Sequence, residues 1–430
     1  MFVIFLDSCF RRTFRTGSFI ISLLFIGSIG CTHQNESETP GYLNGIQNLV
    51  VIIKNTDDHS SIELERVAIL DDPDATNSWY NDMSGTDFPF GGGFDYWFGG
   101  LDIDDFGRIY IGNRPEKTIQ VFDSTGFYQT NLGRQGNGPG EFNEILDIKI
   151  RSNKLYVFDY LQFRTTVFSL DSLKLVEVQN AYLNRFPDID ELTGWHANQF
   201  KLIDGETFLV AFMEEFRNAN VGTPRYNLDK ERSVRYYLVN REGNVLSEML
   251  FELMDHKVIT ADVGGRHLYN LMPVPFLNEP LISVSDEGNI FAANSETSLI
   301  KMYDSTGDYV RAFYIPLDKK SLIRDELIKM YAEEHIQSRN LLLHAELPKT
   351  WPALGDVITD DENRLWISTI QNCENSMYEW WVLQDTGELI TTFKWPENRS
   401  IEKIKNGYVY ARETSKSTGF QTIVTYRIIV

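Results

Sequence analysis

The sequence predicts an all-β fold, a six-bladed β-propeller with an amphipathic helical insertion between blades four and five. The first observation behind this prediction is a motif that occurs six times, in which a short polar turn opens into a strand with an aromatic residue at a fixed place. The six aromatic residues are Tyr110, Tyr156, Phe208, Phe291, Trp366 and Tyr410. One such unit cannot bury both of its faces alone, so the copies must pack against one another.

A second turn signature follows the aromatic strand in three of the copies. Residues 123–126 read Asp-Ser-Thr-Gly, residues 304–307 repeat the same four, and residues 385–387 read Asp-Thr-Gly. Turns of this composition between alternating strands indicate β-hairpins. Three or four antiparallel strands in each repeat are typical of a propeller blade.

Two spacings between the aromatic residues are long, and each is predicted to hold an insertion rather than a seventh blade. Between the third and fourth copies, a polar loop over 216–232 delays the next strand. Between the fourth and fifth copies, residues 319–345 contain neither Pro nor Gly. Apolar residues recur there at helical spacing, which predicts one or two amphipathic helices.

The last repeat is incomplete, because only one strand, at 422–430, follows Tyr410. A propeller leaves no exposed edge when a strand from the other end of the chain completes its last blade. The alternating segment 62–70 is the best candidate for that strand, so the propeller is expected to span residues 46–430. Deleting residues 46–70 should then destabilise the whole fold.

Residues 1–30 have the features of a signal peptide. Three arginines precede an apolar stretch at 19–26, which is too short to span a bilayer as a mature helix. Small residues then lead to Cys31, and this pattern resembles the lipobox of bacterial lipoproteins, although Ser28 stands where that family usually has Leu. The resemblance implies that Cys31 is lipidated and that residues 31–45 form a flexible tether. The alternative is an ordinary secretory signal peptide in which Cys31 has no role.

Charge and cysteine content exclude several classes of protein. The chain has 61 Asp and Glu against 40 Lys and Arg, a net charge of −21, and no basic stripe, so a nucleic-acid partner is disfavoured. The negative field would also repel an anionic membrane surface, so membrane attachment must be covalent or inserted. Without Cys9, which lies in the predicted signal peptide, and the candidate lipid site, only Cys373 remains, and one thiol cannot build a disulfide framework.

A glycine-rich stretch and the strands around it carry a family resemblance. Residues 132–142, Leu-Gly-Arg-Gln-Gly-Asn-Gly-Pro-Gly-Glu-Phe, resemble the loop between blades of NHL-repeat propellers, and Asp159 and Arg164 match the Asp and Arg usual in that family. With the lipoprotein-like N-terminus and the helical insertion, residues 45–430 resemble the six-bladed β-propeller lipoproteins of Bacteroidetes. That family is largely without an assigned activity. The resemblance therefore implies a lipid-anchored place in the cell envelope, at the outer membrane, more than a function.

Motifs that would indicate a metal or a phosphate are weak. The glycine-rich stretch could cradle a phosphate, but no helix follows it and no Lys-Ser/Thr pair closes it. The seven histidines form no i, i+3 or i, i+4 pair, and the acidic runs at 71–74 and 102–107 lack the pattern of a calcium loop. The sequence therefore predicts no catalytic residue, no metal site and no cofactor, although ligands from different blades could still meet at the central tunnel.

Aromatic residues are the better lead to a function. They are concentrated in the segment 77–100, before the first blade. Aromatic faces stack on sugars or anchor a protein partner, but the segment could instead pack as a plug over one face of the propeller. We expect Arg134, Arg164, Trp97 and His196 to mark the face on which a ligand lies.

Two hypotheses of function remain. The first is a cell-envelope lipoprotein whose propeller is a non-catalytic binding module for a protein, peptide or glycan, attached to the membrane through its lipid and without a nucleic-acid partner. The second is a metal-dependent propeller hydrolase or lyase, similar to lactonases, with its site at the central tunnel. Three or more Asp, Glu, His or Asn side chains within coordination distance of one another would favour the second.

Overall fold

The computed structural model describes most of the chain, in separate stretches. These are residues 40–54, 62–70, 98–179, 189–214, 231–269, 274, 276–331, 336–370, 377–415 and 421–429. The chain divides into two compact units, residues 1–45 and residues 46–430. In the first unit the described part holds a short 3-10 helix, η1 (Gly41–Leu43).

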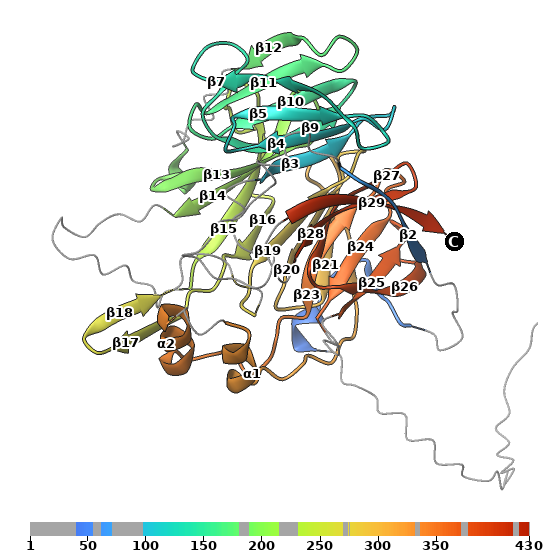
Figure 1. Cartoon of the computed structure of the whole chain (residues 1–430). Helices are drawn as coiled ribbons and strands as arrows, with labels where there is room; N and C mark the ends of the chain where they lie inside the picture. Colours follow the sequence, from blue (N-terminus) through green and yellow to red (C-terminus); the bar gives the residue numbers. More distant parts are fainter. Residues whose placement is uncertain are drawn as a thin grey trace, which may run out of the picture. The chain divides into compact units, whose positions relative to one another are not determined.

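The second unit is built from six sheets that follow one another along the chain, and each sheet is one blade (Figure 1). Blades 1 and 2, blades 4 and 5, and blades 6 and 1 contact each other through their first strands, which are therefore the innermost ones. In the first three blades the strands follow in chain order from the inside outward. Blade 1 has β3 (Phe98–Ile103), β4 (Ile109–Asn113), β5 (Thr118–Phe122) and β6 (Tyr128–Leu132). Blade 2 has β9 (Ile145–Arg151), β10 (Lys154–Asp159), β11 (Arg164–Ser169) and β12 (Leu175–Gln179). Blade 3 has β13 (Trp195–Leu202), β14 (Thr207–Glu214), β15 (Ser233–Asn240) and β16 (Phe251–Met254), and the 3-10 helix η2 (Asp190–Leu192) precedes it.

Two of the other three blades include a strand from the N-terminal part of the propeller. Blade 4 has β19 (Pro280–Val284), β20 (Ile290–Asn294), β21 (Leu299–Tyr303) and β22 (Tyr309–Tyr314), and β1 (Leu49–Val51) adds a fifth strand parallel to β22. Blade 5 has β23 (Leu354–Thr359), β24 (Leu365–Thr369), β25 (Met377–Leu383) and β26 (Leu389–Pro396). Blade 6 has β27 (Arg399–Lys405), β28 (Tyr408–Thr414), β29 (Gln421–Ile429) and β2 (Glu63–Ile69).

Blade 6 joins the two ends of the propeller. β2 pairs antiparallel with β29, from Glu63 opposite Ile429 to Ile69 opposite Val424. The alternating segment 62–70 thus forms the outermost strand of the last blade. β29 therefore pairs with a strand on each side, and its edge is not exposed.

The hydrophobic core is divided among the interfaces between blades. Tyr110 and Val121 of blade 1 pack with Ile148 and Leu155 of blade 2, and similar clusters join blade 4 to blade 5 and blade 6 to blade 1. Strands between two blades are covered on both faces, which is why every residue of β4 and β5 is buried. The polar sequence of β6 alternates instead, because that strand lies at the outer edge.

The recurring turn explains the fixed place of its aromatic residue. In blade 1, Oδ1 of Asp104 accepts backbone N–H groups of the turn, and Oδ2 accepts Nε of Arg108 at 2.6 Å and the hydroxyl of Tyr110 at 3.1 Å. In blade 5, Asp360 makes the same set of bonds, with Nε1 of Trp366 donating at 2.8 Å. The aromatic ring fills the blade interface, and its polar atom bonds the carboxylate that holds the turn.

Insertions lie between blades 3 and 4 and between blades 4 and 5. The first contains a hairpin of β17 (Thr260–Val263) and β18 (Arg266–Tyr269), and the second contains α1 (Arg324–Lys329) and α2 (Ile336–His344). Their apolar side chains share one cluster, in which Ile259, Phe276, Leu327, Leu342 and Trp351 are buried. The sequence predicted only a polar loop for the first long spacing and not this hairpin, which contacts α2 far along the chain. None of the helices in the described stretches is long and apolar enough to cross a bilayer.

Candidate functional site

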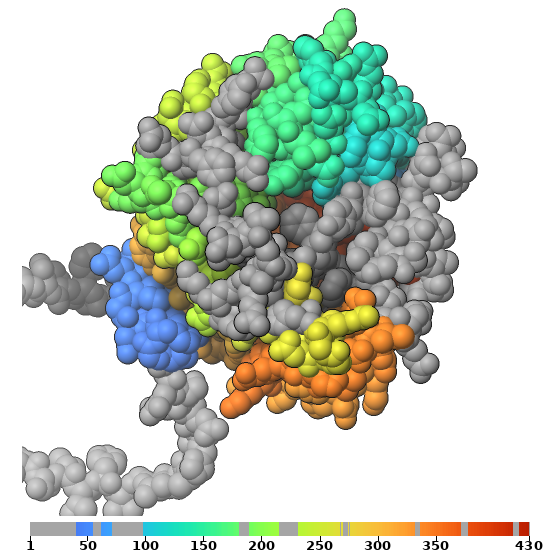
Figure 2. Space-filling view, turned by 90° about the vertical axis from the view of Figure 1, so that its left-hand side faces the viewer, coloured from blue at the N-terminus to red at the C-terminus, as the bar shows by residue number. Residues whose placement is uncertain are grey.

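A cavity of about 720 Å³ lies among the inner ends of blades 1, 2 and 3. Its walls come from the starts of β3 and β9, from residues 198–201 in the second half of β13, and from the loops that follow β4 and β10. The hairpin β17–β18 and the helices also belong to connections that lead into inner strands, so they lie toward the same face of the propeller. Figure 2 shows the hairpin in yellow and the helical insertion in orange beside a central hollow. The inner strands surround a central channel. We call the end of this channel that lies beside the cavity the cavity end.

Irregular pairing in the inner strands shapes the cavity end. The pairing of the inner strand with the second strand shifts register near its start in five of the six blades, with β19 of blade 4 as the exception. Bulges of this kind change the direction of side chains and are frequent beside functional sites. In blade 1 the shift falls at Gly99 and Gly100.

Gly100 allows the neighbouring blade to approach its backbone closely. Its φ is +88°, a left-handed conformation that favours glycine. A Cβ at this position would overlap with Oδ1 of Asp147 on blade 2. The absence of a side chain therefore lets the Asp147 carboxylate lie against the backbone of β3 at the wall of the cavity.

Four charged residues from four blades meet at the cavity end. Asp147 of β9 and Lys201 of β13 line the cavity, and Lys201 is close enough to influence both Asp147 and Asp356 of β23. Glu279, just before β19, lies near Asp356. Since these residues come from blades on both sides of the ring, they face the axis.

The carboxyl groups at the cavity end are poorly compensated. Burial raises the pKa of Asp356 to about 6, and burial together with the charge of Asp356 raises the pKa of Glu279 to about 8. Burial also raises the pKa of Asp147 above its usual value, although Lys201 and Lys149 act in the opposite direction. Ionised carboxylates are therefore costly in this part of the channel.

Two further carboxyl groups near the cavity have cationic partners, with different results. Glu402 accepts Nε of Arg412 at 2.8 Å, but burial and the charges of Asp356 and Asp147 raise its pKa to about 8. On the cavity wall, Glu144 pairs with Arg114 and accepts Nζ of Lys117 at 3.1 Å, and these two cations hold its pKa below the usual value against the effect of burial.

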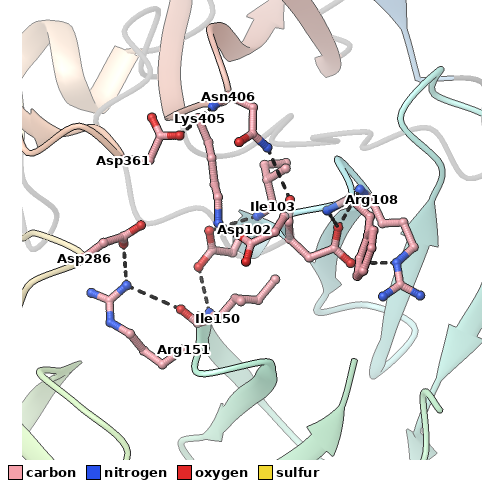
Figure 3. A network of polar contacts seen from close by, with 12 residues as sticks. Asp102, Ile103, Arg108, Ile150, Arg151, Asp286, Asp361, Lys405 and Asn406 are labelled. Carbon is pink, nitrogen blue, oxygen red and sulfur yellow. Dashed lines mark hydrogen bonds and ion pairs between the residues drawn. The ribbon is translucent and has the colours of Figure 1, made fainter. Parts of the chain in front are cut away.

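The opposite end of the inner strands carries a dense set of ion pairs (Figure 3). Asp102 accepts the N–H groups of Ile103 at 2.9 Å and Ile150 at 2.7 Å, and Nζ of Lys403 at 3.0 Å. Arg151 of blade 2 donates to Asp286 and to the carbonyl of Ser285 at the end of blade 4's inner strand. We call Asp102, Lys149, Arg151, Asp286 and Lys403 the ion-pair end.

The ion pairs of this set cross the axis of the ring. Blades 2 and 4 are not neighbours, so Arg151 can reach Asp286 only through the centre, and Nζ of Lys403 from blade 6 lies 3.9 Å from the same carboxylate. Burial alone would raise the pKa of Asp102, but Lys403, Lys149 and the Ile150 N–H lower it well below its usual value. In contrast to the cavity end, these carboxylates are stabilised in their ionised form.

The glycine-rich loop holds one wall of the cavity in place. Asp159 accepts the N–H groups of Asn143 at 2.7 Å and Glu144 at 3.3 Å. Arg164 donates to the carbonyls of Asn137 at 2.9 Å and Gly138 at 2.7 Å, and also to that of Glu141. The Asp and Arg that resemble the NHL pattern therefore bind the loop and position Glu144.

The residues that the sequence analysis selected for ligand binding do not gather at the cavity. Arg164 is bonded to the loop, and Arg134 pairs with Glu141 at 2.7 Å while its side chain remains 79% exposed. His196 lies on β13, two residues before the first cavity residue of that strand. Trp97 and the candidate lipid site Cys31 lie outside the described residues.

The sequence analysis missed the charged residues of the cavity end. One signal was present: Asp102, Asp147 and Asp356 each lie in the first strand of a repeat, and each accepts the N–H of the residue that follows it. A charged residue in an otherwise apolar inner strand indicates that polar side chains line the central channel. The pattern could not show which of the three carboxylates meets cations, because their partners come from other blades.

A metal centre requires several ligands around one point. Within the described stretches, no group of three or more His, Cys, Asp or Glu side chains lies close enough together to hold a metal ion. Asp147, Asp356 and Glu279 are near one another but do not form such a group.

A family model matches part of the chain, and several solved structures are similar to it. Residues 101–253 match the family model described as "6-bladed beta-propeller". None of the curated proteins matches the sequence. A Bacteroides fragilis protein described as exported has a similar structure, with 11% identity, a TM-score of 0.41 and coverage of 89% of this chain and 100% of that chain. A member of the DUF4221 family from Bacteroides vulgatus has 11% identity and a TM-score of 0.44, over 86% of this chain and 98% of that chain.

At these identities the two likenesses concern the fold alone. The six sheets and the family model lead to the same result. The chain is a six-bladed β-propeller, and its residues 101–253 match the family of that description.

Proposed function

We propose that the protein is a non-catalytic binding module of the cell envelope, which holds a protein, peptide or glycan ligand in the cavity among blades 1, 2 and 3. One observation carries this proposal: the cavity is large enough for a side chain or a sugar ring, and several polar side chains of its wall have no partner among the described residues. Asn198, Gln199 and Lys201 follow one another along β13, and their side chains form no hydrogen bond or ion pair with any described residue.

The walls of the cavity suit a ligand with both apolar and polar parts. Phe98, Tyr160 and Phe200 provide aromatic surface, and the amides on β13 can both donate and accept hydrogen bonds. Cavities of this composition are typical of sites that fix a ligand by a few polar contacts on an apolar surface. The alternative, a metal-dependent hydrolase or lyase, needs a group of ligands that the described residues do not form.

Attachment to the membrane through Cys31 is part of this proposal. The lipobox-like sequence supports it, and the outer membrane is the proposed location. Replacement of Cys31 by Ser should move the protein from the membrane fraction to the soluble fraction of the envelope. Unchanged fractionation of the Cys31→Ser variant would contradict the lipid anchor without affecting the binding proposal.

The binding proposal is tested with peptide and glycan arrays probed with the full-length protein. For ligands found in this way, Gln199→Ala and Lys201→Gln should each weaken binding by about tenfold or more, because both remove a polar group from the cavity. Lys394→Gln is the matched control, because Lys394 is exposed on the outer strand β26. Equal binding by the cavity variants and the wild type would place the ligand elsewhere.

A further inference from the structure

The charged residues that line the cavity itself sum to zero. They are Arg114 and Glu144, which pair with each other, and Asp147 and Lys201. Burial raises the pKa of Asp147, and the nearby charge of Lys201 acts against this rise. These two side chains nevertheless form no ion pair with each other or with any other described residue. The wall therefore carries one negative and one positive group that influence each other without forming an ion pair.

Neutral polar groups of the same wall also lack partners. The pairing of β13 with β14 shifts register between Ala197 and Gln199, so Asn198 is an extra residue in the strand. A bulge of this kind changes the direction of side chains, and both Asn198 and Gln199 line the cavity. Their amides and the hydroxyl of Tyr160 form no hydrogen bond with any described residue. Each of these groups can both donate and accept a hydrogen bond.

Apolar side chains form the rest of the wall. They include Leu146, Leu161, Phe200 and the ring of Tyr160, and Leu161 remains 60% exposed. The cavity volume of about 720 Å³ lies within the range of roughly 300–1,000 Å³ that is usual for sites of small ligands. A ligand that fits these surfaces has an apolar face, many hydrogen-bonding groups and no net charge. A pyranose ring has all three properties, because its C–H groups can lie on an aromatic face while its hydroxyl groups point outward.

We propose that the cavity binds a neutral sugar residue of a glycan, in which one hydroxyl group donates to the Asp147 carboxylate and accepts from the Lys201 ammonium group. This inference rests on the proposed binding function and names its ligand class. A hydroxyl group can join the two charges because it has one O–H donor and two acceptor lone pairs. A peptide N–H only donates and a peptide carbonyl only accepts, so neither can join them alone. Further hydroxyl groups bond the amides of Asn198 and Gln199.

The test uses the full-length protein and titration calorimetry with the methyl glycosides of glucose, galactose and mannose. The sugar that binds best is then compared with two forms of itself that carry a carboxylate or an ammonium group at C6. The wild type should bind the neutral form at least about fivefold more tightly than either charged form, because each added charge lies near a like charge of the wall. Free phenylalanine is a fourth probe, since a zwitterion could satisfy both charges without a hydroxyl group.

Two variants connect this preference to named residues. Lys201→Gln leaves the negative charge alone, and should shift the preference by about tenfold toward the ammonium form of the sugar. Asp147→Asn keeps an oxygen that can accept the Ile148 N–H, and should shift the preference by about tenfold toward the carboxylate form. The matched controls are Lys394→Gln and Asp385→Asn, which is on the exposed turn between β25 and β26, and both should leave the preference unchanged. A thermal melt of each sample verifies that the variants are folded.

Each outcome decides the proposal. Opposite shifts in the two variants would support it. Absence of binding by all three glycosides would overturn it, as would a wild-type preference for a charged sugar or for phenylalanine. Shifts in the same direction, or no shift in a folded variant, would also overturn it. If array ligands still depend on Gln199 and Lys201 in any of these cases, the proposed binding function stands and only the ligand class is wrong.

Discussion

The two ends of the propeller channel use the same side chain with opposite consequences. Asp102 at the ion-pair end and Asp356 at the cavity end both lie in inner strands and both accept the N–H of the next residue. Asp102 also meets Lys403 at 3.0 Å and the Ile150 N–H, whereas Asp356 has no ion pair with any described residue. The pKa of Asp102 is lowered and that of Asp356 is raised to about 6.

This difference separates a structural polar cluster from a candidate binding site. At the ion-pair end, side chains of blades 2, 4 and 6 satisfy one another across the axis. At the cavity end, Asp356 and Glu279 form no ion pair with any residue that the structure describes, beside a hollow that a ligand can occupy. A buried charge is stabilising only when it is paired, so the second arrangement is explained if a ligand supplies the missing partner.

The largest effect is expected at the ion-pair end. Asp102→Asn removes the charge that Lys403 and Lys149 face, and leaves two buried ammonium groups close together. Breaking a buried ion pair in this way should lower the free energy of unfolding by about 3–5 kcal/mol. Denaturant unfolding at pH 7 measures it. A loss below about 1 kcal/mol would show that the ion-pair end contributes little.

The same substitution at the cavity end should act in the other direction. Asp356→Asn removes a carboxylate whose ionised form is destabilised by burial and keeps the bond to the Val357 N–H. A shift of about two pKa units corresponds to an increase in the free energy of unfolding of roughly 1–3 kcal/mol at pH 7. The same unfolding experiment detects it, with Asp385→Asn as the control. A marked loss of stability would mean that Asp356 has a partner in the folded protein.

The smallest effect is expected for an ion pair outside the channel. Arg134 pairs with Glu141 on the glycine-rich loop, but its side chain is 79% exposed. Exposed pairs contribute about 0–1 kcal/mol, so Arg134→Ala should change the free energy of unfolding by no more than that. A larger loss would show that the loop depends on Arg134 as well as on Arg164. The exposed fraction of a charged side chain would then not predict its contribution to the free energy of unfolding.

Local sequence was enough to predict the fold. The polar turn, the aromatic residue and the Asp-Ser-Thr-Gly signature are contained within single blades, and the hydrogen bonds of Asp104 and Asp360 show why they recur. The alternation in 62–70 similarly marked a strand that pairs with β29. The turns depend on contacts between residues that are close in sequence. The strand at 62–70 could be predicted because the last repeat lacks its outermost strand.

The candidate site could not be predicted in the same way. Asp147, Lys201 and Asp356 come from three different blades. Asp356 lies two residues further from its turn than Asp102 does, which places it nearer the other end of the strand, but no local pattern shows which charges each aspartate faces. Arg134 and Arg164 drew attention because they belong to a recognisable loop, but the structure uses Arg164 to hold that loop. What decides the role of each charge is its neighbour across the axis, and that depends on how the ring closes.

The pH dependence of stability tests the central claim most directly. The pKa of Asp356 is higher in the folded protein than the usual Asp value, so its ionised form costs stability as the pH rises from about 4 to above 6. The Asp356→Asn variant should therefore match the wild type near pH 4 and exceed it increasingly up to about pH 7, when the free energy of unfolding is measured across that range. Asp102→Asn should instead show a deficit that is nearly constant from pH 4 to pH 7 and shrinks only below about pH 4, because the pKa of Asp102 is lowered in the folded protein. Parallel curves for the two variants, or a deficit for Asp356→Asn at pH 7, would contradict the distinction between the two ends.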